Sequence, residues 1–412
     1  MSRTADSRFD VLIVGGGMVG ASLAVALQPL GLRVGLVESF AFESAAQPAY
    51  DDRSVALSWG SSLILRAMGL ERVLQQGAEP IRSIHVSDRG HFGATRLQAV
   101  QEGVPALGYV VESRVLGQAL HARLAGSALQ LFQPASVTGL QQQADQVALT
   151  VEQQEKTLEL QTRLLVVADG ARSQLRGWLG IGVEERDYHQ TAVIANVTTE
   201  LPHRQTAYER FTPEGPLALL PMTRERYSLV WTRRREQVDA LSGRDDAAFL
   251  AGLQQAFGFR QGQFLHVGQR STFPLMLLKS AHEYAGRALL IGNASHALHP
   301  VAGQGLNLAL RDVAVLADLL AAEAAAAAPD CGRRELLQAY ARERRPDHAS
   351  VVGYTDSLVR LFSAGIPLLG HARAAGLLAV DRVAPLRHLL MRQSMGLRFR
   401  KARLARGLGL RA

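Results

Sequence analysis

Three glycines near the N-terminus, Gly15, Gly17 and Gly20, form the pattern G-x-G-x-x-G, which restricts the fold of this chain more than any other feature. An apolar run at residues 11–14 precedes them and predicts a buried strand, and residues 21–30 predict an apolar-faced helix. Between a strand and a helix, such glycines allow a tight turn and a close approach of the backbone to a pyrophosphate. The pattern therefore indicates a dinucleotide-binding unit.

The segment after this helix completes the unit. Residues 33–37 predict a second strand, which leads directly into Glu38. In dinucleotide-binding folds, an acidic residue about twenty positions after the glycines accepts hydrogen bonds from a ribose hydroxyl. The uncharged run at residues 11–32 is long enough to resemble a signal or membrane segment, but its glycines fit a nucleotide-binding turn better than a spanning helix. We therefore expect no targeting segment here.

A second glycine loop lies far along the chain, within residues 287–320. Residues 288–291 predict a buried strand, and apolar residues from Leu306 onward recur at helical spacing. The loop between them contains Pro300 and Gly303, which prevent either element from extending across it. The start of a helix directs free amide groups at a neighbouring ligand and favours negative charge. Alone, this loop predicts an anion site or a tight turn, and together with the N-terminal pattern it predicts part of one nucleotide site.

Composition sets the class of protein. The chain has 412 residues, of which 47% are hydrophobic and 20% charged, as is typical of a folded protein. This length suits two or three packed domains or one large domain. Cys331 is the only cysteine, so an intrachain disulfide and a cysteine metal cluster are excluded, and a reducing compartment is expected.

The net charge of +8 is unevenly distributed. After Asp381 the chain has no acidic residue, and arginines alternate there with apolar residues such as Leu386 and Leu404. A basic amphipathic tail suits an anionic membrane surface, at about 1 kcal/mol per basic residue near the headgroups. A solvated helical tail or a dimer contact explains the charge equally well. Because no recognition motif or aromatic platform accompanies the charge, nucleic acid is not an expected partner.

Several polar residues stand at the ends of predicted elements. Arg53 precedes a predicted helix, where a guanidinium can neutralise a phosphate. Asp169 follows a predicted strand, where it holds a cofactor hydroxyl, anchors backbone amides or simply caps the next helix. His296 and His299 form a pair without a nearby third ligand, so no metal site is predicted.

Four motifs in order resemble the class A flavoprotein aromatic hydroxylases, which have the para-hydroxybenzoate hydroxylase fold. They are GGGMVG, DDRSVALS, VVADGARSQLR and GNASHALHPVAGQGLNLALRD, and the resemblance covers nearly the whole chain. Within this class the sequence is most similar to the ubiquinone-biosynthesis hydroxylases. The asparagine of GNASH and the stretch at residues 354–362 resemble the 2-polyprenyl-6-methoxyphenol hydroxylase branch.

This resemblance implies an α/β fold (α+β two-layer) with a Rossmann-like FAD domain built from discontinuous segments, a β-rich substrate domain and a helical C-terminal region. The predicted boundaries are residues 1–80, 100–180 and 268–340 for the FAD-binding domain, 81–99 and 181–267 for the substrate domain, and 341–412 for the C-terminal region with its basic tail. From the residues themselves, we expect separate strands at 157–160 and 164–168, and a helix that continues to Pro329.

The resemblance also implies roles for individual residues. Gly15, Gly17 and Gly20 approach the FAD pyrophosphate, and Glu38 binds the adenosine ribose. Arg53 and Arg114 occupy FAD-contacting positions, and Asp169 serves both FAD and the nicotinamide nucleotide. Asn293 replaces the aspartate that most class members use for the ribityl chain and phosphates, so it brings hydrogen-bonding groups without charge. Pro300 lies in the loop that faces the flavin. The pyrimidine side of the flavin ring is lined by Gly303, Gln304, Gly305 and Asn307.

The implied activity is FAD-dependent hydroxylation of a polyprenyl phenol, with NAD(P)H and O2, through a flavin hydroperoxide. Tyr208, Phe211, Leu217 and Leu219 are candidates for the pocket wall, or equally for ordinary sheet core, and no catalytic acid or base is assigned. Because the substrate resides in the bilayer, the expected location is cytoplasmic, peripheral at the inner face of the membrane. Other ubiquinone-biosynthesis proteins are further candidate partners.

Three alternatives remain open. A sister-branch ubiquinone hydroxylase would act at another ring carbon of the same type of lipid. A soluble hydroxylase of the same fold would act on a small aromatic acid. A scaffold protein would bind flavin within a membrane-associated complex and have no catalytic activity.

Overall fold

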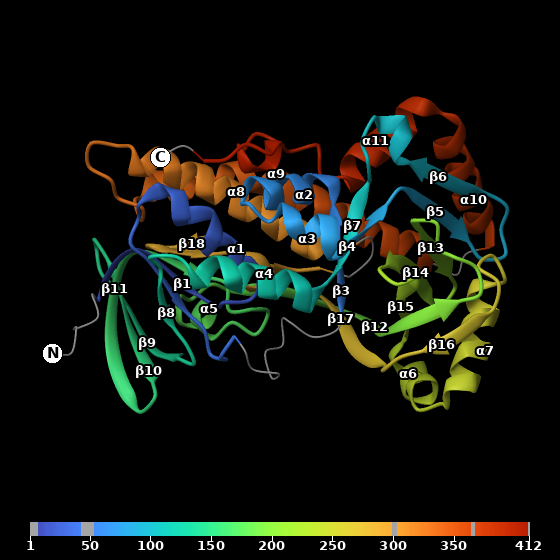
Figure 1. Cartoon of the computed structure of the whole chain (residues 1–412), viewed down its shortest axis with the longest axis horizontal. Coiled ribbons are helices and arrows are strands. Elements are labelled where there is room, and N and C mark those ends of the chain that lie inside the picture. Colours follow the sequence, from blue (N-terminus) through green and yellow to red (C-terminus); the bar gives the residue numbers. More distant parts are fainter. Residues whose placement is uncertain (1–6, 43–52, 299–302, 364–366, 411–412) are drawn as a thin grey trace.

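The computed structural model describes residues 7–42, 53–298, 303–363 and 367–410. Within them, two large sheets form the two halves of an elongated molecule (Figure 1). Two long strands, β12 (Val183–Thr199) and β17 (Ser271–Ser280), belong to the second sheet and extend back toward the first half (Figure 1). The overall α/β architecture is as predicted.

The first sheet contains the N-terminal strand at its centre. β1 (Arg8–Val14) pairs in parallel with β2 (Val34–Val37) on one side and with β11 (Lys156–Val167) on the other. β11 is one continuous strand, so the prediction of two strands at 157–160 and 164–168 was wrong. The other strands of this sheet are β8 (Gln130–Phe132), β9 (Ser136–Gln142), β10 (Val147–Gln153), β18 (Tyr284–Ala285) and β19 (Ala288–Leu290).

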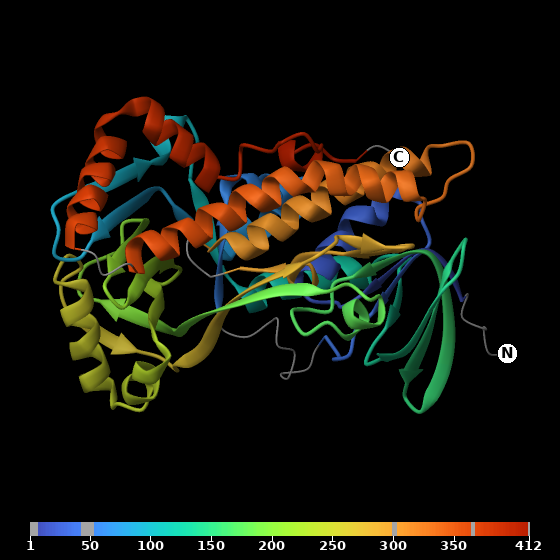
Figure 2. The ribbon, with the colours of Figure 1, turned by 180° about the vertical axis from the view of Figure 1, so that it is seen from behind.

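Helices cover this sheet and bury its apolar face. α1 (Met18–Leu27), α4 (Ser113–Ala125) and α8 (Gln304–Ala324) contribute to one large apolar cluster with the strands. α9 (Arg334–Ser363) lies beside α8 (Figure 2). α8 ends at Ala324, before the Pro329 at which the sequence predicted its end.

A small sheet connects the two halves. In it β7 (Gly108–Glu112) pairs with β3 (Ser54–Ser58) and with β4 (Ala78–Ile81). β3 leads directly into α2 (Trp59–Ala67), because the Ser58 hydroxyl accepts a hydrogen bond from the Ser61 amide and caps that helix. α3 (Glu71–Gln76) follows and ends just before β4.

The second sheet is antiparallel over most of its width and is covered on one face by α6 (Arg235–Ser242) and α7 (Asp246–Phe257). It contains β17 and β20 (His296–Ala297), which lie beyond the predicted domain boundary at residue 268. The strands not yet named are β5 (Ser83–Asp88), β6 (Ala94–Gln98), β13 (Thr206–Thr212), β14 (Gly215–Met222), β15 (Arg226–Arg234) and β16 (Phe264–Val267).

The C-terminal region packs on both halves. α10 (Pro367–Arg382) and α11 (Ala384–Ser394) cover the second sheet beside β5 and β6, and the chain then returns across the first half (Figure 2). There Leu404 is buried in the main apolar cluster, the Gly60 amide donates to the Met395 carbonyl (2.9 Å), and the Arg403 amide donates to Asp318 (2.8 Å). The segment after α11 is therefore held against the protein at Met395, Arg403 and Leu404, although some apolar side chains of the C-terminal region, such as Leu389 and Leu408, are exposed.

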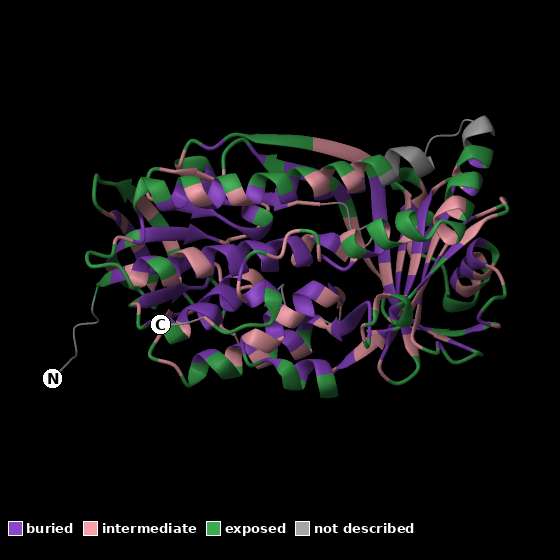
Figure 3. Cartoon of the chain, turned by 90° about the horizontal axis from the view of Figure 1, so that it is seen from above, coloured by how far each residue is buried: buried purple, intermediate pink, exposed green. Residues whose placement is uncertain are grey.

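The distribution of buried residues matches this arrangement of sheets and helices. Buried residues concentrate along the strands and on the inner sides of the helices, whereas the outer turns of the helices are exposed (Figure 3). Among the described residues, no helix combines the length and hydropathy needed to cross a bilayer.

Candidate active site

The turn between β1 and α1 has no room for a side chain at Gly15, nor has the first turn of α1 at Gly20. Gly15 has a φ of +104°, and a Cβ there would lie 2.4 Å from the carbonyl oxygen of Ala168. A Cβ on Gly20 would lie 1.9 Å from the carbonyl oxygen of Gly15. Gly17 is the N-cap of α1 and provides no capping side chain, so the first amides of the helix remain open to a ligand. This backbone geometry fits the close approach of a pyrophosphate.

Two acidic side chains border this turn. The buried Glu38 carboxylate accepts hydrogen bonds from the Gly16 amide (2.5 Å) and the Phe40 amide (2.9 Å), which fixes it at the end of β2. Asp169 follows β11, and its Oδ1 is buried without a hydrogen-bond partner. Burial raises the pKa of the Asp169 carboxyl above its usual value. An unpartnered buried acceptor beside open amides fits a bound nucleotide.

Asp169 is not the N-cap residue of the helix that follows it. That helix, α5 (Gln174–Trp178), is capped by Ser173, whose hydroxyl accepts a hydrogen bond from the Arg176 amide (3.0 Å). The Asp169 carboxyl nevertheless hydrogen-bonds with the Ser173 side chain and the Leu175 backbone, so it helps to anchor the start of α5. Its role toward FAD and the nicotinamide nucleotide remains a prediction.

The second glycine loop meets the first one at α1. A short 3-10 turn, η4 (Gly292–Ala294), follows β19, and a Cβ on Gly292 would lie 3.1 Å from a methyl group of Val19 on α1. Asn293 in this turn is exposed and lines a cavity. The two signatures, which are far apart in the sequence, therefore meet at the N-terminal half of α1.

The start of α8 is attached to β3 by one side chain. The Asn307 amide group donates to the carbonyls of Ala56 (2.8 Å) and Gly303 (2.7 Å), and its oxygen accepts from the Ser58 amide (2.7 Å). Gln304 is buried beside it. Asn307 thus orients the helix start toward the cavity that Gly303, Gln304 and Gly305 also line. Pro300 and His299 lie outside the described residues.

The two candidate arginines are neighbours through the backbone but differ in surroundings. The Ser113 amide donates to the carbonyl of Arg53 (2.7 Å), which brings Arg53, just before β3, close to Arg114, which follows the end of β7. The Arg53 guanidinium lies 4.6 Å from the centre of the Phe273 ring. Arg114 pairs with Glu112 (3.3 Å) and lines a separate surface hollow instead of the main cavity. Their contact with FAD remains a prediction.

A cavity of about 480 Å³ lies between the α8 start and the second sheet. One wall is formed by β3, Asn293 and residues 303–307, and the others by strands of the second sheet and by α9, α10 and α11. Its surface is mostly apolar, with side chains such as Ile194, Leu220 and Val230. None of its described lining residues is a lysine or an arginine.

Two of the four residues predicted for the pocket wall line this cavity. Phe211 and Tyr208 line the cavity, although the Tyr208 ring also packs against Phe257, with ring centres 5.4 Å apart. Leu217 and Leu219 do not line it: both are fully buried in the core under α7. Side chains alternate along a strand, so the residues of β14 that face the cavity are Ala218 and Leu220.

A lining residue that the sequence did not suggest is Glu209, which lies between Tyr208 and Arg210 on β13. The available signal was alternation: Glu209 and Phe211 are two positions apart and therefore share one face of the strand. An acidic residue on the same face as a predicted pocket residue was overlooked.

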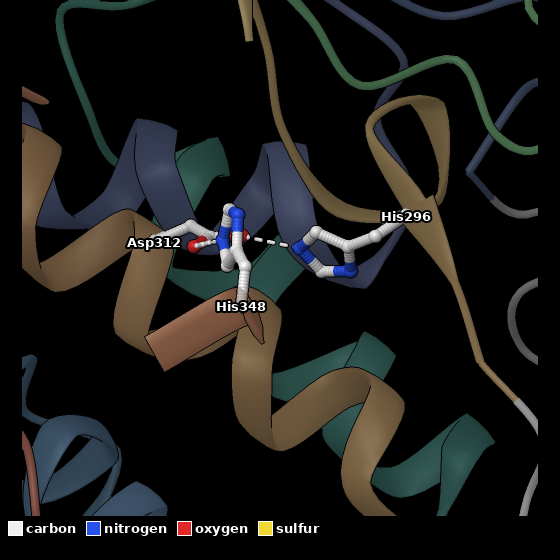
Figure 4. Close-up of side chains that lie close together, drawn as sticks. All are labelled: His296, Asp312 and His348. Carbon is white, nitrogen blue, oxygen red and sulfur yellow. Dashed lines mark hydrogen bonds and ion pairs between the residues drawn. The ribbon is translucent and has the colours of Figure 1, made fainter. Parts of the chain in front are cut away.

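A buried ionic cluster holds the second glycine loop in place. His296 on β20 and His348 on α9 each contact the Asp312 carboxylate of α8 through Nε2 at 2.7 Å (Figure 4). Arg344 also donates to Asp312 (2.7 Å) and pairs with Asp347 (2.8 Å). Because His296 follows Asn293 by three residues, the cluster attaches the cavity-lining turn to both helices.

The carboxylates and guanidiniums of this cluster are equal in number. Burial opposes ionisation of Asp312, but His348, Arg344 and His296 hold the pKa of its carboxyl well below the usual range. Burial lowers the pKa of His348 and outweighs the opposing effect of Asp312, which favours the neutral imidazole. Asp347 is likewise ionised, because Arg311 and Arg344 lower its pKa against the effect of burial. Two carboxylates therefore face two guanidiniums.

The same three residues are spaced as metal ligands. One ligand atom from each of His296, Asp312 and His348 lies within 4.8 Å of the others. Arg344 already occupies an oxygen of the shared carboxylate, and a guanidinium at this position repels a cation. This arrangement fits an internal ion-pair network better than a metal centre.

Comparison with known proteins agrees with this geometry. Residues 8–355 match the FAD binding domain family. The chain is 41% identical to a ubiquinone hydroxylase, UbiL, of Rhodospirillum rubrum over 95% of this chain and 91% of that protein. It is 32% identical to 3-demethoxyubiquinol 3-hydroxylase of Escherichia coli over 94% of this chain and 98% of that protein.

A solved structure shows the same fold. The anhydrotetracycline hydroxylase OxyS of Streptomyces rimosus superposes with a TM-score of 0.72 at 26% identity, covering 95% of this chain and 77% of that one. The glycine turn, the open amides of α1 and the unpartnered oxygen of Asp169 fit the FAD that this family binds. The chain belongs to the family of FAD-dependent hydroxylases that includes the ubiquinone hydroxylases, and it is a monooxygenase with FAD as cofactor and NAD(P)H as co-substrate.

Proposed function

We propose that this protein hydroxylates the ring of a polyprenyl phenol, specifically 2-polyprenyl-6-methoxyphenol, in ubiquinone biosynthesis. The observation that carries the proposal is the aliphatic cavity beside the α8 start, whose described lining residues include no lysine or arginine. A small aromatic acid would need a buried cation for its carboxylate. A prenyl chain instead gains free energy from aliphatic walls, at roughly 25 cal/mol per Å² of apolar surface removed from water.

The chain's own residues would orient the ring and stabilise charge. FAD, when bound, supplies the redox and oxygen chemistry. The amides at the start of α8, held by Asn307, face the cavity and favour negative charge that develops on a neighbouring ring. The apolar walls exclude water, which protects reactive oxygen from wasteful hydrolysis.

The branch assignment is tested by the precursor that accumulates when the gene is deleted. Support for the 2-polyprenyl-6-methoxyphenol branch comes from Asn293 and from residues 354–362. We expect 2-polyprenyl-6-methoxyphenol to accumulate, and mass spectrometry of the extracted lipids would identify it. Accumulation of a demethoxy intermediate or a later one would instead assign the chain to a sister branch.

We further propose that α10 and α11 dock the protein on an anionic membrane surface. Inward residues of these helices, Leu377 and Leu390, line the cavity. Their neighbours Leu378, Leu386 and Leu389 are exposed, the last to 63%. Exposed Arg382 and Arg392 flank this apolar surface. Helices with apolar and basic residues on the outer side bind at the headgroup level, which would bring a lipid substrate next to the cavity.

A double substitution, Leu386→Asp with Leu389→Asp, tests this docking. Partial burial of two leucines in the membrane interface contributes roughly 2 kcal/mol, so binding to anionic vesicles should weaken at least about tenfold. Co-sedimentation with phosphatidylserine vesicles would measure it. Leu265→Asp is the matched control, because Leu265 is an exposed leucine on β16, beside α7 rather than α10. Equal binding of the double variant and the control would eliminate this surface.

A further inference from the structure

Glu209 places one carboxyl group in the wall of an otherwise apolar cavity. It lies on β13, with Ala218 opposite it on β14 and Val86 opposite it on β5. Both of these neighbours line the cavity as well, so this part of the wall consists of Glu209 surrounded by small and aliphatic side chains.

No partner neutralises this carboxyl group among the described residues. No hydrogen bond or ion pair to Glu209 is found among them, in contrast to Glu38 and Glu112, whose carboxylates are both engaged. Glu209 is half-buried and lines the cavity. A carboxylate in apolar surroundings without a partner is costly, and groups with a shifted pKa of this kind cluster at functional sites. Burial raises the pKa of Glu209 to about 7, so both protonation states are accessible near neutrality.

The other titratable groups nearby do not serve the same purpose. From α9, Tyr354 lines the cavity, and burial raises the pKa of its hydroxyl to about 12, with the charge of Glu209 adding to the effect. Tyr354 therefore stays protonated. His85 is beside the Tyr208 ring on the opposite face of the strands, and Arg210 donates to the carbonyl of Ala256 on α7. Glu209 is the one carboxylate among the described lining residues.

We propose that Glu209 binds the phenol hydroxyl of the substrate and accepts its proton during hydroxylation. This assignment rests on the proposed function, because it requires a phenol in the cavity. The phenol O–H donates to the carboxylate, and the proton moves from the phenol oxygen to Glu209 as the ring is hydroxylated. When the aromatic ring is restored, the hydroxylated carbon loses its own hydrogen as a proton to water, and the proton on Glu209 returns to the phenol oxygen, so the carboxylate is regenerated. A ring that has lost its phenol proton is richer in electrons and accepts oxygen more readily.

The same contact would position the substrate. An apolar cavity holds a prenyl chain without fixing its depth, whereas a hydrogen bond to a charged group fixes one end of the molecule. With the hydroxyl at Glu209, the ring lies between β13 and the loop of residues 303–307, which line the same cavity. Glu209 thus determines which end of the lipid faces the α8 start.

The test compares a short-chain polyprenyl phenol with its methyl ether, which lacks the O–H donor. Binding of both to the FAD-loaded enzyme is measured by calorimetry from pH 5.5 to 8.5. The wild-type enzyme should prefer the phenol by at least about tenfold at pH 8.5, because a hydrogen bond to a charged group is strong. That preference should fall as the pH decreases through about 7, where Glu209 becomes protonated.

The Glu209→Gln variant should no longer show this pH dependence of phenol binding. Its kcat should fall at least about 100-fold, while its FAD content and Tm stay at wild-type values. Glu209→Asp should restore part of both properties. The Tyr354→Phe variant, which lacks the neighbouring hydroxyl, should still show the change in phenol preference near pH 7. If the Glu209→Gln variant retains that change or the wild-type kcat, the assignment to Glu209 is wrong although the phenol hydroxylase function stands. If the wild-type enzyme binds neither compound, the proposed function itself fails.

Discussion

Gly20→Ala should abolish FAD binding. The new methyl group would lie 1.9 Å from the carbonyl oxygen of Gly15, a backbone atom that cannot rotate away, so α1 must move relative to β1. Because this movement disturbs the amides at the start of α1, we expect at least about 3 kcal/mol of destabilisation. FAD content of the purified variant, read from its visible absorbance, should fall below about a tenth of the wild-type value.

Gly353→Ala is the matched control for this substitution. Gly353 also lies within a helix, α9, but a Cβ there has no heavy atom within 4 Å, and the residue is exposed. Alanine in an exposed helix should leave FAD content unchanged and raise stability by about 0.5–1 kcal/mol. A Gly20→Ala protein that stays fully yellow would show that the turn tolerates a side chain and would contradict the assigned pyrophosphate site.

Asp312→Asn should cost about 3–5 kcal/mol of folding stability. The substitution removes the negative charge that Arg344, His296 and His348 contact. The buried Arg344 guanidinium then loses one of its two carboxylate partners. Urea unfolding followed by circular dichroism would measure the loss. We also expect weaker FAD binding, because His296 attaches the turn containing Asn293 to this carboxylate.

Asp246→Asn provides the comparison for a surface ion pair. Asp246 also pairs with an arginine, Arg270, at 2.6 Å, but its side chain is 61% exposed. Exposed pairs contribute about 0–1 kcal/mol, so this variant should be nearly as stable as the wild type. If the two variants lose equal stability, the buried cluster has no special role.

The cluster also predicts lower stability in acid. His348 has a folded-state pKa below its usual value, so the unfolded chain binds a proton more readily, and stability should decline as the pH falls below about 6.5. Asp312 also has a lowered folded-state pKa, so its contribution is present above about pH 4 and is lost as the pH decreases further.

Local patterns predicted the nucleotide turn well. The strand, the glycines and the acid at residue 38 are contiguous in the sequence, and backbone geometry alone determines their arrangement. The meeting of this turn with the second glycine loop was also predicted, because both signatures were expected to belong to one nucleotide site. In the structure, Gly292 packs against Val19 as that expectation requires.

Features that depend on contacts between distant residues were not predicted. In GPLALLPM, apolar residues occupy both faces of β14, so nothing in the sequence indicated whether Leu217 or Ala218 faces the cavity. In the C-terminal segment, charge suggested a membrane tail, whereas the burial of Leu404 beside α2 depends on a partner more than three hundred residues earlier. The ionic cluster joins three separate elements, although Asp312 within an apolar helix was a signal that could have indicated it.

Oxygen transfer to the lipid ring by the purified enzyme is the most direct test of the proposed function. FAD-loaded protein in detergent would be supplied with NAD(P)H, a short-chain 2-polyprenyl-6-methoxyphenol and ¹⁸O-labelled oxygen gas. We predict NAD(P)H consumption that the phenol stimulates, and a product that carries one labelled oxygen on its ring. A protein that binds FAD but shows neither stimulation nor labelled product would contradict the account and would indicate a flavin-binding scaffold instead.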